Sequence, residues 1–156
     1  MSLEGIPVEV GAVAPDFTLR DQHNVEISLT SLRGKAVLLV FYPLAFTGVC
    51  AGELNLIQSE LDVFHNANVT VLAVSVDSPY ALRVFSDTEG LKFPMLSDFW
   101  PHGAVASAYG VLSTEVGIAL RGTFLVDRAG VVRWSVVNDI PDARDIDDYR
   151  KAIAAL

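Results

Sequence analysis

Residues 36–50 read AVLLVFYPLAFTGVC and join an apolar run to the single cysteine of the 156-residue chain. The uninterrupted run at residues 36–42 is typical of a strand that is buried on both faces of a sheet. Pro43 cannot donate a backbone hydrogen bond and ends that strand. Apolar residues recur at helical spacing from residue 53 to residue 65. We therefore expect Cys50 in the first turn of a helix that follows a buried strand.

This position favours the ionised form of the Cys50 thiol. The free N–H groups and the positive dipole end of a helix N-terminus stabilise an anion, and a thiolate is a nucleophile. The alternative for a lone cysteine is a small buried hydrophobic residue. The arrangement of strand, loop and helix favours the first interpretation and indicates covalent redox chemistry.

The rest of the chain predicts an α/β fold in a single domain over residues 1–156, with a central mixed β-sheet flanked by helices and an N-terminal β-hairpin. Ser78 as cap and Pro79 in the first turn predict a helix that Gly90 ends. The helix that carries Cys50 is expected to run to about His65. The other expected elements are a hairpin at 17–28, strands at 69–76 and 95–97, a short helix at 104–109, a hairpin at 122–136 and a last helix opened by the acidic stretch 142–148.

Composition excludes several classes of function. Apolar residues make up 51% of the chain, and the formal net charge is −8. An acidic chain with scattered Lys and Arg is not expected to bind nucleic acid, and no apolar run is long enough to span a membrane. The N-terminus lacks the features of a signal peptide, and one cysteine cannot form an internal disulfide, so we expect a cytoplasmic protein. The three histidines share no metal-ligand spacing, so no metal or cofactor is expected.

Thr47 lies three residues before Cys50, where a thioredoxin-like redox motif has a second cysteine. An internal dithiol exchange is therefore lost, but a threonine hydroxyl could donate to the thiolate and then to an oxygen attached to it. Thr47 could equally serve as a helix cap. Pro43 could shield the sulfur from water, or simply end the strand.

Two charged residues could complete such a site. Arg121 interrupts an apolar stretch, and a guanidinium that points inward needs a partner. It either faces Cys50, where it would favour the thiolate and hold a substrate oxygen, or it lies on an exposed strand face. Glu53 lies one helical turn after Cys50 and would disfavour a thiolate, unless it pairs with Arg121 and orients it. Otherwise Glu53 is a solvated helix residue.

Pro43, Thr47 and Cys50 match the Pro-x-x-x-Thr-x-x-Cys signature of the peroxiredoxins, and Arg121 matches the arginine that completes their site. Most of the chain resembles this AhpC/TSA family. Residues 14–19, 96–105 and 121–124 are similar to its one-cysteine alkyl hydroperoxide reductase E group.

The resemblance implies a thioredoxin-like fold and a thiol peroxidase that reduces hydrogen peroxide and organic or lipid hydroperoxides, with peroxynitrite as a further substrate. It implies that Cys50 attacks the O–O bond and becomes a sulfenic acid. Arg121, Thr47 and the backbone N–H of Cys50 would stabilise the peroxide oxygens. Glu53 would orient Arg121. The walls of the substrate pocket would be Phe46 and Trp100.

Because the chain has no second thiol, an external thiol must reduce the sulfenic acid. The resemblance suggests mycothiol with a mycoredoxin, or a thioredoxin-like protein, as the reductant, and a homodimer as the assembly. Two other functions stay open at this point. One is a monothiol exchange or adaptor protein without peroxidase activity, and the other is a thioredoxin-like binding domain with an inert cysteine.

Overall fold

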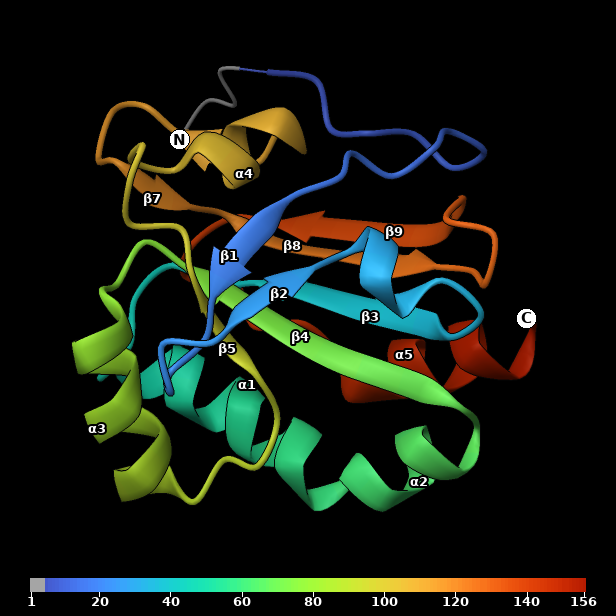
Figure 1. Ribbon diagram of the computed structural model, residues 1–156, viewed down its shortest axis with the longest axis horizontal. Helices are drawn as coiled ribbons and strands as arrows, with labels where there is room; N and C mark the ends of the chain where they lie inside the picture. The colour runs from blue at the N-terminus through green and yellow to red at the C-terminus, as the bar shows by residue number, and fades with distance from the viewer. Residues whose placement is uncertain (1–4) are drawn as a thin grey trace.

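The computed structural model describes residues 5–156, which form one mixed sheet between two layers of other structure (Figure 1). The sheet has seven strands in the order β2-β1-β5-β4-β3-β8-β9, with β3, β4 and β5 parallel and the other neighbours antiparallel. The strands are β1 (Thr18–Arg20), β2 (Glu26–Ser28), β3 (Ala36–Phe41), β4 (Val69–Ser75), β5 (Met95–Ser97), β8 (Arg121–Val126) and β9 (Val132–Asn138). The mixed sheet and the N-terminal hairpin formed by β1 and β2 confirm the prediction.

Helices cover both faces of this sheet, as Figure 1 shows. In the described residues no helix is both long and apolar enough to cross a lipid bilayer. The α-helices are α1 (Gly48–Ser59), α2 (Leu61–Asn66), α3 (Pro79–Glu89), α4 (Ala104–Ala108) and α5 (Ile146–Ala154), and a single 3-10 turn spans Thr30–Leu32.

Strand β3 lies inside the sheet, between β4 and β8, and contributes to two cores. Successive side chains of a strand point to opposite faces, and here both faces are buried. One core contains Leu38 and Val40 with side chains from α1, α2, α3 and α5. The other contains Leu39 and Phe41 with side chains from α4 and the N-terminal segment. The strand is therefore fixed on all sides, and the chain that leaves it starts from a rigid position.

Helix α3 confirms its sequence signals. The Ser78 hydroxyl accepts a hydrogen bond from the Ala81 N–H at 3.2 Å, and Pro79 occupies the first turn. Gly90 ends the helix with a left-handed φ of 68°, a conformation that glycine adopts without steric cost.

Two predicted boundaries differ from the structure, and one small element was not predicted. The helix that carries Cys50 stops at Ser59, and α2 begins after Glu60, whose ψ of 6° is not helical. Leu61 stays buried across this break, so the apolar spacing could not reveal it. The last helix begins only after Asp145, whose side chain accepts from the Asp147 N–H at 2.9 Å. A small hairpin of β6 (Leu112–Ser113) and β7 (Ile118–Ala119) was not predicted.

Candidate active site

Sheet register brings Arg121 to Cys50. Strand β8 runs antiparallel to β3 with Val40 opposite Thr123, so Arg121 lies beside the chain as it leaves β3. Thr123 and Arg121 share one face of β8, because side chains alternate along a strand. Helix α1 covers this face, and Cys50 is its third residue. The Nη1 atom of Arg121 lies 3.3 Å from the Cys50 sulfur. The structure thus places these two side chains in contact, as the sequence analysis expected.

Glu53 lies one turn further along α1 and binds Arg121. Its Oε1 atom accepts from Arg121 Nη1 at 2.6 Å, and both side chains are buried. The Nε atom of Arg121 donates to the Ile140 carbonyl at 2.6 Å. These two bonds fix the plane of the guanidinium group that faces the sulfur, so the expected pairing of Glu53 with Arg121 is present.

A second arginine, Arg144, completes the cluster and was missed by the sequence analysis. Its side chain donates to both Glu53 oxygens, through Nε at 3.0 Å and Nη2 at 2.9 Å. Its Nη1 atom donates to the Phe41 carbonyl at 2.7 Å and to the Gly122 carbonyl at 3.0 Å. Arg144 therefore satisfies backbone carbonyls at the end of β3 and the start of β8 while it holds Glu53. The available signal was a lone arginine inside the acidic stretch 142–148, which the sequence analysis interprets only as the start of the last helix.

The cluster is short of one negative charge. It contains two buried guanidinium groups and one buried carboxylate, and burying an unbalanced charge is costly. Burial by itself would raise the pKa of Glu53, but the hydrogen bonds and charge of Arg144, with the charge of Arg121, outweigh it and lower that pKa. The Cys50 sulfur is the group that faces Arg121 at this place, at 3.3 Å from Nη1.

The loop from Pro43 to Thr47 separates β3 from α1. Thr47 has the extended backbone of an N-cap residue, but its hydroxyl donates to the Leu44 carbonyl at 2.7 Å and caps no helix N–H. Phe46 has a left-handed φ of 66°, which is unusual for a bulky side chain and costs about 1–3 kcal/mol. Its ring packs on Phe85 with the centroids 5.2 Å apart. The loop is therefore a strained turn held in place by its neighbours.

The Cys50 sulfur is buried, but the residues that directly precede Cys50 in the chain are exposed. Cys50 is 0% exposed, whereas Thr47, Gly48 and Val49, which directly precede it, are exposed. Pro43 is buried next to this segment. Access of a small oxidant to the sulfur is therefore expected past the exposed N-terminal turn of α1.

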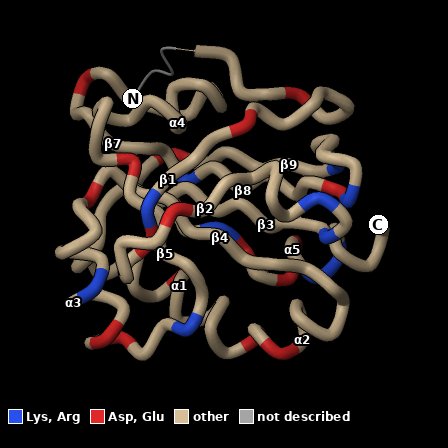
Figure 2. Tube along the Cα trace, viewed as in Figure 1, with Lys and Arg blue, Asp and Glu red and all other residues tan. Residues whose placement is uncertain are grey.

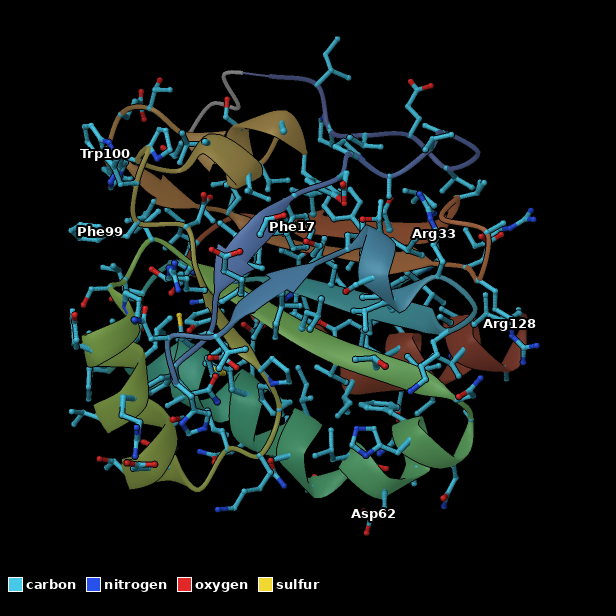
Figure 3. All side chains as sticks on the ribbon, in the orientation of Figure 1. Phe17, Arg33, Asp62, Phe99, Trp100 and Arg128 are labelled. Atoms are coloured by element: carbon cyan, nitrogen blue, oxygen red, sulfur yellow. The ribbon has the colours of Figure 1, made fainter. Side chains whose placement is uncertain are left out.

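Trp100 lies away from this cluster. It is 81% exposed and points outward at the edge of the molecule (Figure 3). It lines a separate cavity of about 270 Å³ together with residues of β1 and with Pro79, and Cys50 is not among the residues around that cavity. The structure thus brings Cys50, Glu53 and Arg121 together and leaves Trp100 apart.

Among residues 5–156 there is also no group of three or more His, Cys, Asp or Glu side chains that could hold a metal ion.

Replacing Glu53 with Gln should change how stability depends on pH. Because the pKa of Glu53 is lowered in the folded state, its contribution is complete above its ordinary value of 4.5 and is lost as the pH falls below that value. We expect Glu53→Gln to lower the free energy of unfolding by about 3 kcal/mol at pH 7, because two buried guanidinium groups lose their counter-charge. The difference from wild type should narrow as the pH falls below 4.5, measured by urea unfolding.

Glu26→Gln is the matched control, because Glu26 pairs with Arg20 on the surface and should contribute less than about 1 kcal/mol. If the free energies of unfolding of wild type and Glu53→Gln changed in parallel across this pH range, the lowered pKa of Glu53 in the folded state would be contradicted.

Comparisons with known proteins agree with this geometry. The family model described as AhpC/TSA family matches residues 10–135. The chain is 49% identical to alkyl hydroperoxide reductase E of Mycobacterium tuberculosis over 96% of this chain and 98% of that protein. It is 36% identical to a thioredoxin peroxidase of Echinococcus granulosus, over 94% of this chain and 80% of that protein.

Solved structures support the same assignment. The reduced 2-Cys peroxiredoxin of Plasmodium vivax superposes with a TM-score of 0.86 at 35% identity, over 96% of this chain and 82% of that one. AhpC of Enterococcus faecalis also gives a TM-score of 0.86, at 30% identity, over 94% of this chain and 90% of that one. The sheet, the cysteine at the start of α1 and these similarities lead to one conclusion: the chain belongs to the AhpC/TSA family and is a peroxiredoxin, a thiol peroxidase with a thioredoxin-like fold.

Proposed function

We propose that Cys50 is the peroxidatic residue of this thiol peroxidase. The Cys50 thiolate donates an electron pair to one peroxide oxygen, and an S–O bond forms as the O–O bond breaks. The second oxygen leaves as an alkoxide or hydroxide and takes up a proton to give an alcohol or water. Sulfur is oxidised by two electrons to the sulfenic acid, and the peroxide is reduced by two. The contact that carries this proposal is the one between Arg121 Nη1 and the Cys50 sulfur, at 3.3 Å.

Arg121 stabilises negative charge at both stages of this reaction. Before attack it faces the thiolate, and during attack it is placed to donate to the oxygen on which charge develops. Glu53 and Arg144 are positioning residues in this scheme, because they hold the Arg121 guanidinium and neutralise part of its charge. Thr47 is exposed at the start of α1, and Cys50 lies buried in the first turn behind it. The Thr47 hydroxyl would leave the Leu44 carbonyl to donate to the bound peroxide, and the Cys50 N–H would donate from the first turn.

We infer that hydrogen peroxide and organic or lipid hydroperoxides are substrates, with peroxynitrite as a further candidate. The observation that favours organic peroxides is the apolar character of the exposed residues near the loop. Phe46 is 57% exposed and Val49 is 42% exposed, so an alkyl chain could lie against them while its peroxide group enters.

Cys50→Ser should abolish peroxide consumption, because a hydroxyl is not ionised at neutral pH. Arg121→Ala should slow the reaction by roughly 10²–10³-fold, as expected when a donor to developing charge is removed. Stopped-flow measurements of Trp fluorescence with hydrogen peroxide and a fatty-acid hydroperoxide would give both rates. Arg83→Ala on the surface of α3 is the control and should react at the wild-type rate. Wild-type activity in Cys50→Ser would exclude the assignment, whereas no peroxide consumption by the wild type would favour an adaptor or a binding domain with an inert cysteine.

We further propose that the reductant is a separate thiol, either mycothiol with a mycoredoxin or a thioredoxin-like protein. The chain contains one cysteine, so the sulfenic acid has no internal thiol to condense with. A first external thiol would form a mixed disulfide with Cys50 and release water. A second thiol would then attack that disulfide and release the Cys50 thiolate.

Mixing the oxidised enzyme with each candidate thiol should identify this reductant. We expect a small thiol to give a mixed disulfide at Cys50 that adds one thiol mass to the chain, detected by intact-mass spectrometry. Multiple-turnover peroxide consumption should then require the matching redoxin. Full turnover with no added thiol would contradict an external reductant.

A homodimer is the assembly that we propose for this enzyme. Large apolar side chains are exposed along one edge of the molecule, where Figure 3 shows Phe99 and Trp100 pointing outward on the side of α3. Tyr80 and Trp100 are 79% and 81% exposed. Residues 99–114, which follow β5, carry no Lys, Arg, Asp or Glu. Figure 2 accordingly draws the tube around α4 in tan. A second copy could therefore cover this edge without the repulsion expected between two chains that each carry a charge of −8.

Tyr80→Glu should convert such a dimer into a monomer, because it places two carboxylates in one apolar interface. Light scattering on a size-exclusion column should show the mass of two chains for wild type and of one chain for the variant. Val63→Glu on α2 is the control, since Val63 is also exposed but lies on another helix. A monomeric wild type, or dissociation by both substitutions alike, would exclude this interface.

A further inference from the structure

One carboxylate connects the loop before α1 to the centre of the sheet. The Oδ2 atom of Asp77 accepts from the Ala45 N–H at 2.9 Å and from the Ser75 hydroxyl at 2.7 Å. The backbone carbonyl of Asp77 accepts from the Ser97 hydroxyl at 2.7 Å. Asp77 is therefore held by residues at the ends of β4 and β5, and it in turn holds the loop that joins β3 to α1.

This hydrogen bond acts next to the strained residue of the loop. Ala45 precedes Phe46, whose φ of 66° is left-handed. The cost of such a backbone conformation and the gain from a hydrogen bond to a charged acceptor are of similar size. The bond to Asp77 is thus large enough to decide whether the turn keeps this conformation.

Different elements hold the two halves of the active site. The peroxide-binding half is Thr47 with the first turn of α1, and the guanidinium half is Arg121. Thr47 follows the strained residue directly, and its carbonyl accepts the first helical bond of α1, from Ala51 at 2.9 Å. The position of Thr47 and of the first turn therefore depends on the loop. Arg121, by contrast, is fixed by β8, Glu53 and Ile140. A change at Asp77 should move the peroxide-binding half and leave the guanidinium half in place.

Tyr42 shows that Asp77 and the sulfur act on the same small region. Tyr42 is fully buried, and its hydroxyl makes no hydrogen bond of normal geometry among residues 5–156. Burial is the main cause that raises the pKa of Tyr42, and the charges of Asp77 and Cys50 raise it further.

We propose that Asp77 is a positioning residue for the peroxidase reaction, whose bond to the Ala45 N–H sets the placement of Thr47 and the first turn of α1 for the incoming peroxide. This inference rests on the proposed role of Cys50. It concerns the hydrogen bond and not the charge of Asp77, and this distinction defines its test.

Asp77→Ala should lower the second-order rate constant with hydrogen peroxide by roughly 10- to 100-fold, as expected for a displaced reacting geometry. Asp77→Asn should keep the rate within about threefold, because an amide oxygen can still accept from Ala45. Ser75→Ala removes one bond that holds Asp77 but leaves the loop bond, so it should lower the rate by clearly less than Asp77→Ala does. If Asp77→Ala does not fold, Asp77→Ser is the alternative. The shorter serine side chain cannot reach the Ala45 N–H, and it changes the polarity of the site less than alanine does.

Alkylation of Cys50 by iodoacetamide over a range of pH provides the readout that separates positioning from a general structural effect. In Asp77→Ala the midpoint of this pH profile should shift by less than it does in Arg121→Ala, because the Arg121 contact with the sulfur is held by β8 and Glu53, while the peroxide rate falls. Equal losses in Asp77→Asn and Asp77→Ala would overturn the proposal, because the charge would then be the cause. An unchanged peroxide rate in Asp77→Ala, or a parallel fall in alkylation, would also overturn it. Each rate is compared with the rate of active wild type. A failure of the Cys50 assignment would show itself separately, as peroxidase activity that remains in Cys50→Ser.

Discussion

The buried pairing of Glu53 with two arginines is the interaction on which the active site depends. Glu53 accepts bonds from Arg121 on β8 and from Arg144 in the loop after β9, so one carboxylate joins α1 to both. Ion pairs in a protein interior are stable only when every hydrogen-bonding group is satisfied. Arg144 meets this condition by donating to the Phe41 and Gly122 carbonyls as well. The group left without a full counter-charge is Arg121, and it faces the sulfur.

This arrangement supplies what the proposed attack of Cys50 on a peroxide requires, because the chain has no second cysteine to assist it. The N-terminus of α1 and the Arg121 guanidinium approach the sulfur from different directions, and both favour negative charge. They are aligned before the substrate arrives, so little reorganisation is needed during the reaction. The free-energy cost lies within the site itself, in a left-handed Phe46 and in three charged side chains that are removed from water.

The fold supplies the rigidity that this alignment requires. Strand β3 is buried on both faces and paired on both edges, so the position at which its chain ends is well defined. Arg121 lies beside that point through the pairing of β8 with β3, and Arg144 donates to the Phe41 carbonyl at the end of β3. The loop of residues 43–47 is the exception, since it leaves the sheet and is held through Asp77 from the neighbouring strand. The part of the site that meets the substrate is thus the part least constrained by the sheet.

The sequence by itself determined the elements that depend on local pattern. The apolar run of β3, the cap and stop of α3, the mixed sheet and the place of Cys50 at a helix start all follow from spacing and residue type. It also indicated Arg121 and Glu53, because charges in apolar surroundings need partners. The break at Glu60 and the late start of α5 did not follow, since the apolar spacing continues across the first and the acidic residues mask the second.

Only the tertiary structure decided the role of Arg144. Its partners lie on α1, β3 and β8, at separations of up to 103 residues, and no local pattern encodes such contacts. The same holds for the bond between Asp77 and Ala45, and for the outward position of Trp100. Local sequence specifies which backbone conformations are favourable over a few residues. Which charged groups meet in the interior depends on how the strands pair and how the helices pack, and that is settled by the whole chain at once.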